Sequence, residues 1–592
     1  MQPECSRSLF LTPMDAKFQS ELPGGLPTPH SRRVKIWPVV LAGAALALIH
    51  LAYTSYLSGN STEISDNVLC PQASPLTPRK NESLWAELTN LHATDEFAAR
   101  AIAQLSAAVQ IPTETFDAMG PVGEDERWAS RGLFVEHLVQ AFPLIHATLE
   151  LKKVNTYGLL YTWKGADLSL KALLMMGHYD VVPVAPLSAD QWTHPAYSGY
   201  FDGESIWGRG SLDDKSGVIS ILTSIEVLLE KGFTPTRSVV LSFGFDEEGG
   251  GYQGAGELGK VLLDRFGPDS FAMIVDEGSG FSEQYGAAFA VPGVAEKGSV
   301  NVNIEVQTPG GHSSVPPEHT SIGILAALIV HLENNAPKAA LEVGTPAFEM
   351  AQCFGAHGPA IAPKLRSAIL RAVKSKKALR TAESMLLQDK MFKALVGTTL
   401  AVDIINGGVK SNALPEQASA VVNHRIATQS SVNATISRDA FVVKDLASKF
   451  NLSMTAYGEE MTSASISAGS LILTAPLRVS LEPAPITPTG ADAAPYQILA
   501  GTIRSTYNTR RALKGAKDDL PLFVTPGLMS GNTDTRFNWA LSEHIFRYGH
   551  RNLLRGGLGN IHTVNEHISA DSFTEMITFF TTLILNMDEA SL

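Results

Sequence analysis

Three short apolar runs mark the middle of the chain, at residues 172–177, 238–245 and 271–275. Each is too short for a typical helix and lacks strict polar alternation, as expected of a strand buried on both faces of a sheet. Between the first two runs, apolar residues recur along one helical face, and Gly232 is placed to end that helix. The apolar positions of this helix are Val218, Ile221, Leu222, Ile225, Leu228 and Leu229. The pattern predicts an α/β catalytic domain with a mostly parallel sheet.

A different pattern begins at Ser299, where apolar and polar residues alternate strictly. The apolar positions are Val300, Val302, Ile304 and Val306. Such alternation is typical of a strand with one face in solvent. We therefore expect a smaller α+β lid domain at residues 299–429, inserted between the two parts of the catalytic domain at 83–298 and 430–592.

A long uncharged run lies near the N-terminus, from Ile36 to Leu57, directly after a basic cluster. A helix of this length can cross a bilayer, and the basic cluster predicts that the preceding tail faces the cytosol. We expect a disordered cytosolic tail at residues 1–35, a transmembrane signal anchor at 36–57 and a stalk at 58–82. A cleaved signal peptide and a buried helix of a soluble domain are the alternatives.

Composition adds two limits and one indication. The net charge of −13 argues against a nucleic-acid-binding surface. Three cysteines, Cys5, Cys70 and Cys353, match no zinc-finger spacing and allow at most one disulfide. Four Asn-x-Ser/Thr sequons follow the uncharged run and fit a glycosylated, luminal body. They are Asn60, Asn81, Asn433 and Asn451.

Metal-capable side chains follow the first predicted strand. His178 and Asp180 are two residues apart, so in extended backbone their side chains point the same way. A metal-binding imidazole usually donates its second N–H to a carboxylate, which Asp180 supplies. Asp213 and Asp214 lie in a Gly-rich loop before the predicted helix. Taken singly, these residues have simpler explanations, a structural histidine beside a turn and a helix cap.

The next two predicted strands repeat this arrangement. Glu247 and Glu248 follow the second strand, Asp276 follows the third, and His562 stands in a Gly-rich loop near the C-terminus. Because the carboxyl ends of parallel strands meet at one edge of a sheet, these side chains are expected to converge in one crevice. Two histidines and several carboxylates, without a thiolate, suit zinc.

Five motifs, in this order, resemble the dizinc peptidase family of aminoacylase, carboxypeptidase G and carnosinase. They are Gly-His178-x-Asp180, Gly-Arg-Gly-x-x-Asp213-Asp-Lys, Asp-Glu247-Glu248, Asp276-Glu-Gly and His562-x-x-Asn-Glu. Each motif is short, but the ordered set spans the body from about residue 85 to the end and is specific. The long N-terminal segment, the size and the Asn-Glu after His562 most resemble the vacuolar carboxypeptidase S branch, known as Gly-Xaa carboxypeptidase.

The resemblance implies a site for two zinc ions per subunit. Asp213 would bridge the two ions. His178 and Asp276 would complete one site, and Glu248 and His562 the other. Two dications held close together need such a shared carboxylate between them.

The same resemblance implies the catalytic parts. Glu247 would be the general base that activates a water molecule, and Asp180 would orient His178. In this family the peptide bond after the bridging aspartate is often cis, which places it at Asp213–Asp214.

Three residues of the predicted lid resemble the family's substrate-binding elements. His312, in Gly310-Gly-His-Ser-Ser, would stabilise the oxyanion of the tetrahedral intermediate. Asn412 and Arg425 would hold the free carboxylate of the substrate, for which a planar guanidinium is suited. The oligomeric state stays open: a homodimer through the lid is one alternative, in which His312 would act in its own subunit or in the partner.

The expected activity is hydrolysis of the C-terminal peptide bond of short peptides, in the vacuole lumen, by a single-pass membrane protein that is anchored or released by cleavage. An amidase acting on N-acyl amino acids and a carnosinase-type dipeptidase are alternatives, because they share every residue named above. A catalytically dead binding scaffold is the alternative from another class. It is disfavoured because all proposed ligands and Glu247 are present.

Overall fold

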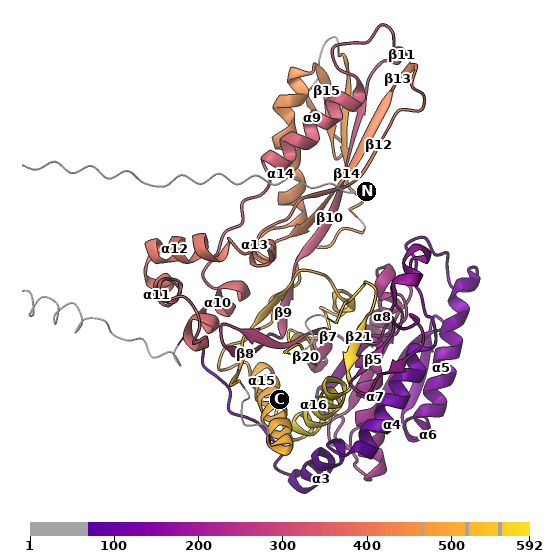
Figure 1. The fold of residues 1–592 in the computed structure, drawn as a ribbon, viewed down its shortest axis with the longest axis vertical. Coiled ribbons are helices and arrows are strands. Elements are labelled where there is room, and N and C mark those ends of the chain that lie inside the picture. Colours follow the sequence, from indigo (N-terminus) through magenta and orange to yellow (C-terminus); the bar gives the residue numbers. More distant parts are fainter. Residues whose placement is uncertain (1–68, 463–466, 478, 516–519, 555–558) are drawn as a thin grey trace, which may run out of the picture. The chain divides into compact units, whose positions relative to one another are not determined.

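The structure is a computed structural model. It describes residues 69–462, 467–477, 479–515, 520–554 and 559–592. These residues belong to one compact unit, residues 64–592, which holds two main β-sheets (Figure 1).

The first sheet carries the buried strands that the sequence predicts. Its main path runs β1-β2-β6-β3-β7-β20-β9-β19, and β8 and β18 join beside β7. At its centre β6, β3, β7 and β20 are mutually parallel, which confirms that the three predicted strands end at the same edge. The strands are β1 Glu150–Val154, β2 Gly158–Trp163, β3 Ala172–His178, β6 Val239–Gly244, β7 Phe271–Gln284, β8 Ala287–Ala290, β9 Gly293–Glu296, β18 Leu522–Val524, β19 Gly527–Met529 and β20 Ile545–Asn552.

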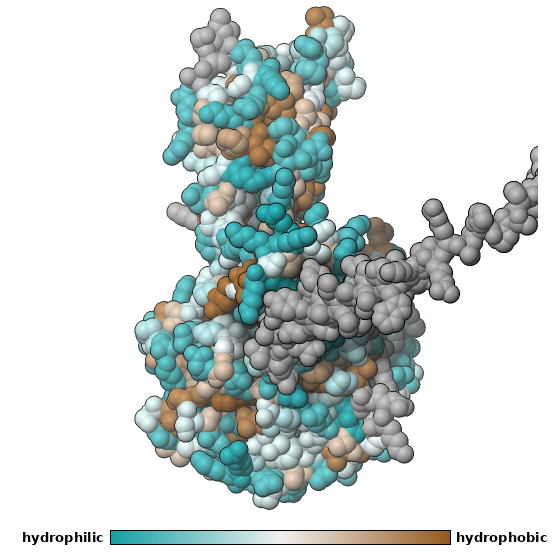
Figure 2. Space-filling view, turned by 90° about the vertical axis from the view of Figure 1, so that its left-hand side faces the viewer, coloured by the Kyte–Doolittle hydropathy of each residue, from teal (hydrophilic) through white to brown (hydrophobic). Residues whose placement is uncertain are grey.

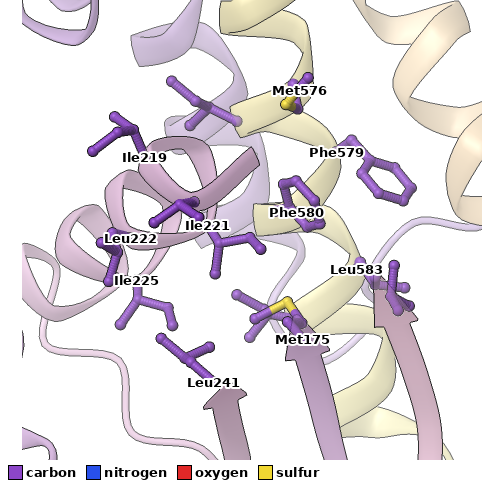
Figure 3. Packing of buried hydrophobic residues seen from close by; sticks show 14 of the residues in the cluster. Met175, Ile219, Ile221, Leu222, Ile225, Leu241, Met576, Phe579, Phe580 and Leu583 are labelled. Carbon is purple, nitrogen blue, oxygen red and sulfur yellow. The ribbon is translucent and has the colours of Figure 1, made fainter. Parts of the chain in front are cut away.

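Helices cover both faces of this sheet. On one face α7 and α16 pack over β3 and β6, where Met175 and Leu241 meet Ile221 and Phe580 (Figure 3). Next to Met175 in sequence, Leu174 and Met176 point to the other face and pack against α8. The helices of this part are α3 Glu82–His92, α4 Asp95–Val109, α5 Ser130–Ala141, α6 Pro143–Thr148, α7 Lys215–Glu230, α8 Ala255–Phe266, α15 Ala494–Lys514 and α16 Ala570–Glu589. Burial on both faces explains why the strand sequences lack polar alternation.

The second sheet has the order β12-β14-β10-β17-β15-β16. The residues of β10 alternate between buried and more exposed positions, which confirms the alternation that the sequence predicts from Ser299 onward. Its strands are β10 Gly298–Gln307, β12 Ala401–Gly407, β14 Gln417–Ile426, β15 Leu452–Ala456, β16 Glu459–Thr462 and β17 Gly469–Thr474, and helices α9 Ser321–Asn334 and α14 Val432–Lys449 pack against it. Because β15, β16 and β17 follow residue 430, we propose that the lid extends to about Thr474.

Two small sheets complete the strands. A three-stranded sheet joins β4 Tyr200–Phe201, β5 Ser205–Trp207 and β21 His567–Ser569, and a two-stranded sheet joins β11 Gly311–His312 to β13 Ala413–Leu414. The first small sheet ties the loop before Asp213 to the loop after His562, because β5 and β21 flank those loops.

Four further helices lie between β11 and β12. They are α10 Pro346–His357, α11 Pro363–Arg371, α12 Lys376–Leu386 and α13 Lys390–Val396. Their buried side chains share a core with Phe289 of β8 and Leu528 of β19, so these helices pack on the edge of the first sheet.

A disulfide joins Cys70 to Cys353 in this core. The sequence allowed one bond without choosing the pair. The bond ties the start of the described chain to α10 across a separation of 283 residues. Disulfides persist in oxidising compartments, which agrees with a luminal body.

The predicted fold class needs one correction. The architecture is mixed α/β, but the transmembrane helix is not supported, since no described helix has the length and apolar character needed to cross a bilayer. Residues 36–57, on which that prediction fell, lie outside the described residues.

Substituting Cys353→Ser should lower the free energy of unfolding by roughly 2–5 kcal/mol, because the bond limits the unfolded chain across a long loop. Denaturant unfolding of wild type and variant, under non-reducing conditions, measures this difference. Cys5→Ser is the control, because Cys5 takes no part in the bond. A change below about 0.5 kcal/mol, the range of ordinary surface substitutions, would contradict the expectation.

Candidate metal centre

The carboxyl edge of the first sheet gathers the predicted metal ligands. His178 is the last residue of β3 and is buried. Its Nδ1 lies 3.3 Å from Oδ1 of Asp180 and 3.1 Å from the Asp180 carbonyl oxygen. The backbone N–H groups of Glu247 and Glu248 each donate to the Asp180 carboxylate, at 3.1 Å. Asp180 therefore positions both the imidazole and the segment that carries the two glutamates.

The two oxygens of Asp213 face two different histidines. Oδ1 lies 3.5 Å from Nε2 of His178, and Oδ2 lies 3.0 Å from Nε2 of His562. The same Nε2 of His562 lies 3.1 Å from Oε1 of Glu248. One carboxylate thus stands between two histidine-containing groups, which is the arrangement that a bridging ligand requires.

A loop held by Glu566 carries Asp213. The Glu566 side chain is fully buried and accepts hydrogen bonds from the N–H groups of Gly210, Leu212 and Asp213, and from the guanidinium of Arg209 at 2.6 Å. Glu566 lies four residues after His562. One side chain therefore joins the loops of two proposed ligands that are more than 300 residues apart in sequence. The peptide bond between Asp213 and Asp214 is cis, as expected.

The third strand contributes a residue that the sequence analysis did not select. Glu277, rather than Asp276, forms a possible metal-holding group with His178 and Glu247, and its Oε1 lies 3.4 Å from His178 Nε2. Asp276 is buried beside it, and its Oδ1 accepts the Glu277 N–H. The pairing of β7 with β20 is irregular between Asp276 and Ser279, and Oδ2 of Asp276 has no hydrogen-bond partner among the described residues, so strand alternation does not decide which of the pair faces the cluster.

Burial and mutual repulsion shift the ionisation of these groups. Burial raises the pKa of Glu247 well above its usual value, with a contribution from the negative charge of Glu277. The same two causes raise the pKa of Asp276 to about 7. Burial also favours the neutral form of Asp213, but hydrogen bonds from His178 and His562 hold its pKa well below the usual range.

The cluster therefore holds more carboxylates than its own cations balance. A bound dication would lower these raised pKa values, because it favours the ionised form of every ligand.

The donor set and its spacing fit zinc. Ligand atoms bound to one tetrahedral zinc, each about 2.1 Å from it, lie about 3.4 Å apart. The distances from His178 Nε2 to the oxygens of Asp213 and Glu277, and from His562 Nε2 to those of Asp213 and Glu248, are 3.0–3.5 Å. The groups that can hold a metal among the described residues are His178-Glu247-Glu277 and His178-Asp213-Glu248.

Arg551 is a second residue without a sequence signal. Its buried guanidinium donates to Oδ1 of Asp214 at 2.9 Å and lies 3.9 Å from Asp213. It places a permanent positive charge beside the proposed bridging carboxylate.

A cavity of about 400 Å³ lies beside the cluster. Asp213, Glu247, Glu277 and His562 form its polar end, and Leu212, Met529, Leu553 and Ile561 give it an apolar wall. A substrate bound here would have its reacting group at the metal ligands and an apolar group against these side chains.

The structure brings one of the three predicted lid residues near this cavity. The Arg425 guanidinium donates at 3.0 Å to the side-chain oxygen of Asn532, which lines the cavity. His312 and Asn412 lie together at the β11–β13 pair and are exposed. The His312 imidazole contacts Ser314, and in Figure 1 β11 lies at the end of the second sheet remote from the start of β10. The roles of these two residues stay predictions.

The predicted glycosylation sites differ in their surroundings. Asn433 and Asn451 are exposed. Asn81 is partly buried and its amide donates to Glu589 at 3.2 Å. Asn60 lies outside the described residues.

Comparison with known proteins gives consistent matches. Residues 174–586 match the sequence model of the family described as peptidase family M20/M25/M40. Carboxypeptidase S of Saccharomyces cerevisiae is 37% identical over 524 residues, covering 88% of this chain and 89% of that protein. The N-fatty-acyl-amino acid synthase/hydrolase of Mus musculus is 30% identical over 524 residues, covering 86% of this chain and 92% of that protein.

Among solved structures, an M20 family metallo-carboxypeptidase from Sulfolobus solfataricus aligns with a TM-score of 0.55. It is 16% identical and covers 82% of this chain and 99% of that one. At this identity the likeness concerns the fold alone.

Replacing Glu566→Gln should lower metal affinity by roughly 10–100-fold, as is typical for residues that support metal ligands. The neutral amide keeps one oxygen acceptor but loses the charge facing Arg209, so the loop of Asp213 loosens. Equilibrium dialysis against zinc, with thermal unfolding of the metal-free protein, measures affinity and stability separately.

The matched control is Glu226→Gln. Glu226 is also buried and accepts two backbone N–H groups, from Leu144 and Ile145 at 2.9 Å. It should lose a similar amount of stability and keep its metal affinity. Equal loss of metal affinity in the two variants would refute the positioning role of Glu566.

Proposed function

The chain belongs to peptidase family M20/M25/M40, and from this premise we propose that it is a dinuclear-metal carboxypeptidase. It removes the C-terminal residue from short peptides, as the name of its relative carboxypeptidase S suggests. The observation that carries the proposal is the placement of Asp213, whose two oxygens face His178 and His562 separately.

We assign the ligands from this geometry. Asp213 would bridge the two metal ions, His178 and Glu277 would complete one site, and Glu248 and His562 would complete the other. Asp276 was expected in the place of Glu277, and the grouping of Glu277 with His178 supports the change. Zinc, which suits this nitrogen and oxygen donor set, would polarise the scissile carbonyl and make a water molecule more acidic.

Glu247 is the proposed general base. Its carboxylate lines the cavity and its backbone is fixed by Asp180. It takes a proton from the attacking water as the new C–O bond forms, and it gives that proton to the amine nitrogen as the C–N bond breaks. Both transfers use one side chain, so no other proton donor is required.

Recognition of the substrate carboxylate falls to Arg425. Its hydrogen bond to Asn532 holds the guanidinium toward the cavity, and a planar fork matches a carboxylate. His312 and Asn412 would complete the site only when the β11–β13 pair, of this copy or of a second copy, approaches it. That step stays a prediction.

The apolar wall of the cavity supports a substrate with an apolar side chain or acyl group. This observation also favours the second candidate function, hydrolysis or formation of N-acyl amino acids, because a relative at 30% identity is an N-fatty-acyl-amino acid synthase/hydrolase. A carnosinase-type dipeptidase would use the same ligands and stays an alternative.

The vacuole lumen is the proposed location. Two observations support it. The chain is similar to carboxypeptidase S, which the resemblance above places in a vacuolar branch. The Cys70–Cys353 disulfide suits an oxidising compartment.

The homodimer through the lid also stays a proposal. The edge strand β12 exposes Ile404 and Ile405 at 52% and 58%. An exposed apolar edge strand is a surface that proteins usually cover.

The substrate class can be tested with the zinc-loaded chain on a blocked Gly-Leu dipeptide and a long-chain N-acyl leucine, following leucine release. The carboxypeptidase proposal expects the larger kcat/KM for the peptide. A larger kcat/KM for the acyl substrate would replace it with the amidase function and leave the metal assignment intact.

The blank for this assay is Glu247→Gln. The amide cannot accept the proton, so kcat should fall by at least roughly 100-fold, while zinc content stays at wild-type level. If zinc is lost together with activity, Glu247 is a ligand and not the base.

The cavity assignment predicts that Leu553→Ser lowers the preference for leucine over alanine at the C-terminal position by about tenfold, because a small polar residue removes apolar contact. The ratio of kcat/KM for the two peptides measures it. Leu187→Ser, at a residue 96% exposed and outside the cavity lining, is the control. An unchanged ratio in Leu553→Ser would place the side-chain pocket elsewhere.

A further inference from the structure

A second, basic cavity lies on helices α11 and α12, apart from the metal ligands. It measures about 430 Å³. Its basic lining comprises Lys364 of α11 and Lys376, Lys377 and Arg380 of α12. Thr381 and Ser384 add hydroxyl groups to the same wall. We call these six residues the basic groove.

Its charge contrasts with the rest of the chain. Between residues 359 and 395, nine residues are Lys or Arg and two are Asp or Glu, whereas the whole chain carries −13. Both acids are already engaged, since Glu383 accepts the N–H of Leu341 and Asp389 accepts the N–H of Phe392. Across the described residues, the four cations of the groove have no ion-pair partner. The groove is therefore a concentrated and uncompensated positive site.

The placement of the lysines on the helices increases this charge. Lys376 and Lys377 begin α12, and Lys364 is the second residue of α11. The first turn of a helix already carries a partial positive charge, where acidic residues or bound anions are favourable and lysines are not. Neither first turn contains an acidic residue. Helix stability does not explain these lysines, whereas a bound anion would compensate both sources of charge.

The groove stands on a fixed base. Lys377, Arg380, Thr381 and Ser384 follow the spacing of one helical face. The opposite face of α12 buries Ala378, Ala382 and Leu386, and the last two belong to the core that contains the disulfide. In Figure 2, hydrophilic residues form a band across the middle of the face that holds α11 and α12. A packed helix fixes the backbone positions from which its exposed cations extend.

We propose that the basic groove binds a compact anion that carries several phosphate groups. A phosphate group can bear close to two negative charges, so two or three of them match four cations within this small volume. Lysine is a common phosphate ligand, acting as a point charge. An acidic peptide spreads one charge over about 3.3 Å of extended chain per residue, which fits the compact site less well. The strongly negative net charge disfavours a nucleic acid.

The test is titration of the full chain with sodium tripolyphosphate in low-salt buffer by calorimetry. The variant Lys376→Glu with Lys377→Glu should bind at least tenfold more weakly than wild type. Glutamate in a first helical turn favours the helix, so this variant should fold and should be at least as thermostable as wild type without ligand. Added tripolyphosphate should raise the unfolding temperature of wild type more than that of the variant.

The matched control is Lys152→Glu with Lys153→Glu, which makes the same charge change at two exposed lysines of β1. It should bind tripolyphosphate as wild type does. Any phosphate binding at the metal ligands is common to all three proteins and cancels in the comparison. Peptidase activity does not enter the measurement, so failure here is separate from failure of the proposed function.

Two further arms define the source of the phosphate. Phosphatidylcholine vesicles with and without phosphatidylinositol phosphates test a lipid headgroup, and binding that requires the phosphorylated lipid and is lost in the Lys376 and Lys377 variant would support that source. Poly-glutamate tests an acidic chain. Tighter binding of poly-glutamate than of tripolyphosphate, equal binding by wild type and variant, or no binding at all would overturn the proposal.

Discussion

The crowding of buried carboxylates at one edge of a parallel sheet is the constraint on which the rest of this structure depends. Glu247 follows β6 and Glu277 lies in β7, which are both parallel to β3, and the loop before α7 brings Asp213 to the same edge. Burial, together with the neighbouring negative charges, raises the pKa values of Glu247 and Glu277 and so disfavours their ionised forms. Two bound dications would remove this conflict, and metal binding would then add to the stability of the fold as well as to its chemistry.

The second requirement is that segments far apart in the sequence are held together around the cluster. Glu566 ties the C-terminal loop of His562 to the loop of Asp213 through four hydrogen bonds. Arg551 of β20 adds a charge beside Asp214. Both side chains are buried, and a buried charge without its partner is costly. The two loops therefore keep their positions together, which holds Asp213 and His562 near each other before any metal binds.

Much of this arrangement could be predicted from the sequence, and the features that could not be predicted have identifiable physical reasons. The apolar runs predicted the central strands, and the two-residue spacing of His178 and Asp180 predicted their contact. The resemblance selected Asp276, whereas the structure groups Glu277 with His178, and a strand pattern alone does not say which of two neighbouring residues faces the metals. The sequence showed Glu566 only as part of the motif that begins at His562. Its role could not be predicted, because its hydrogen bonds to the loop of Asp213 span more than 300 residues and leave no local sequence pattern. The pairing of Cys70 with Cys353 is equally non-local.

The junction between the two sheets limits how His312 can reach a reaction centre. Glu296, at the end of β9, is buried and paired with Arg547 at 3.1 Å. Next to it, the Lys297 ammonium donates to the carbonyl groups of Ala394 and Gly397. Breaking a buried pair of this kind is costly, so bending at residues 296–297 is disfavoured. If His312 stabilises the oxyanion, the movement must therefore occur beyond this junction within the lid, or a second copy of the chain must supply the histidine.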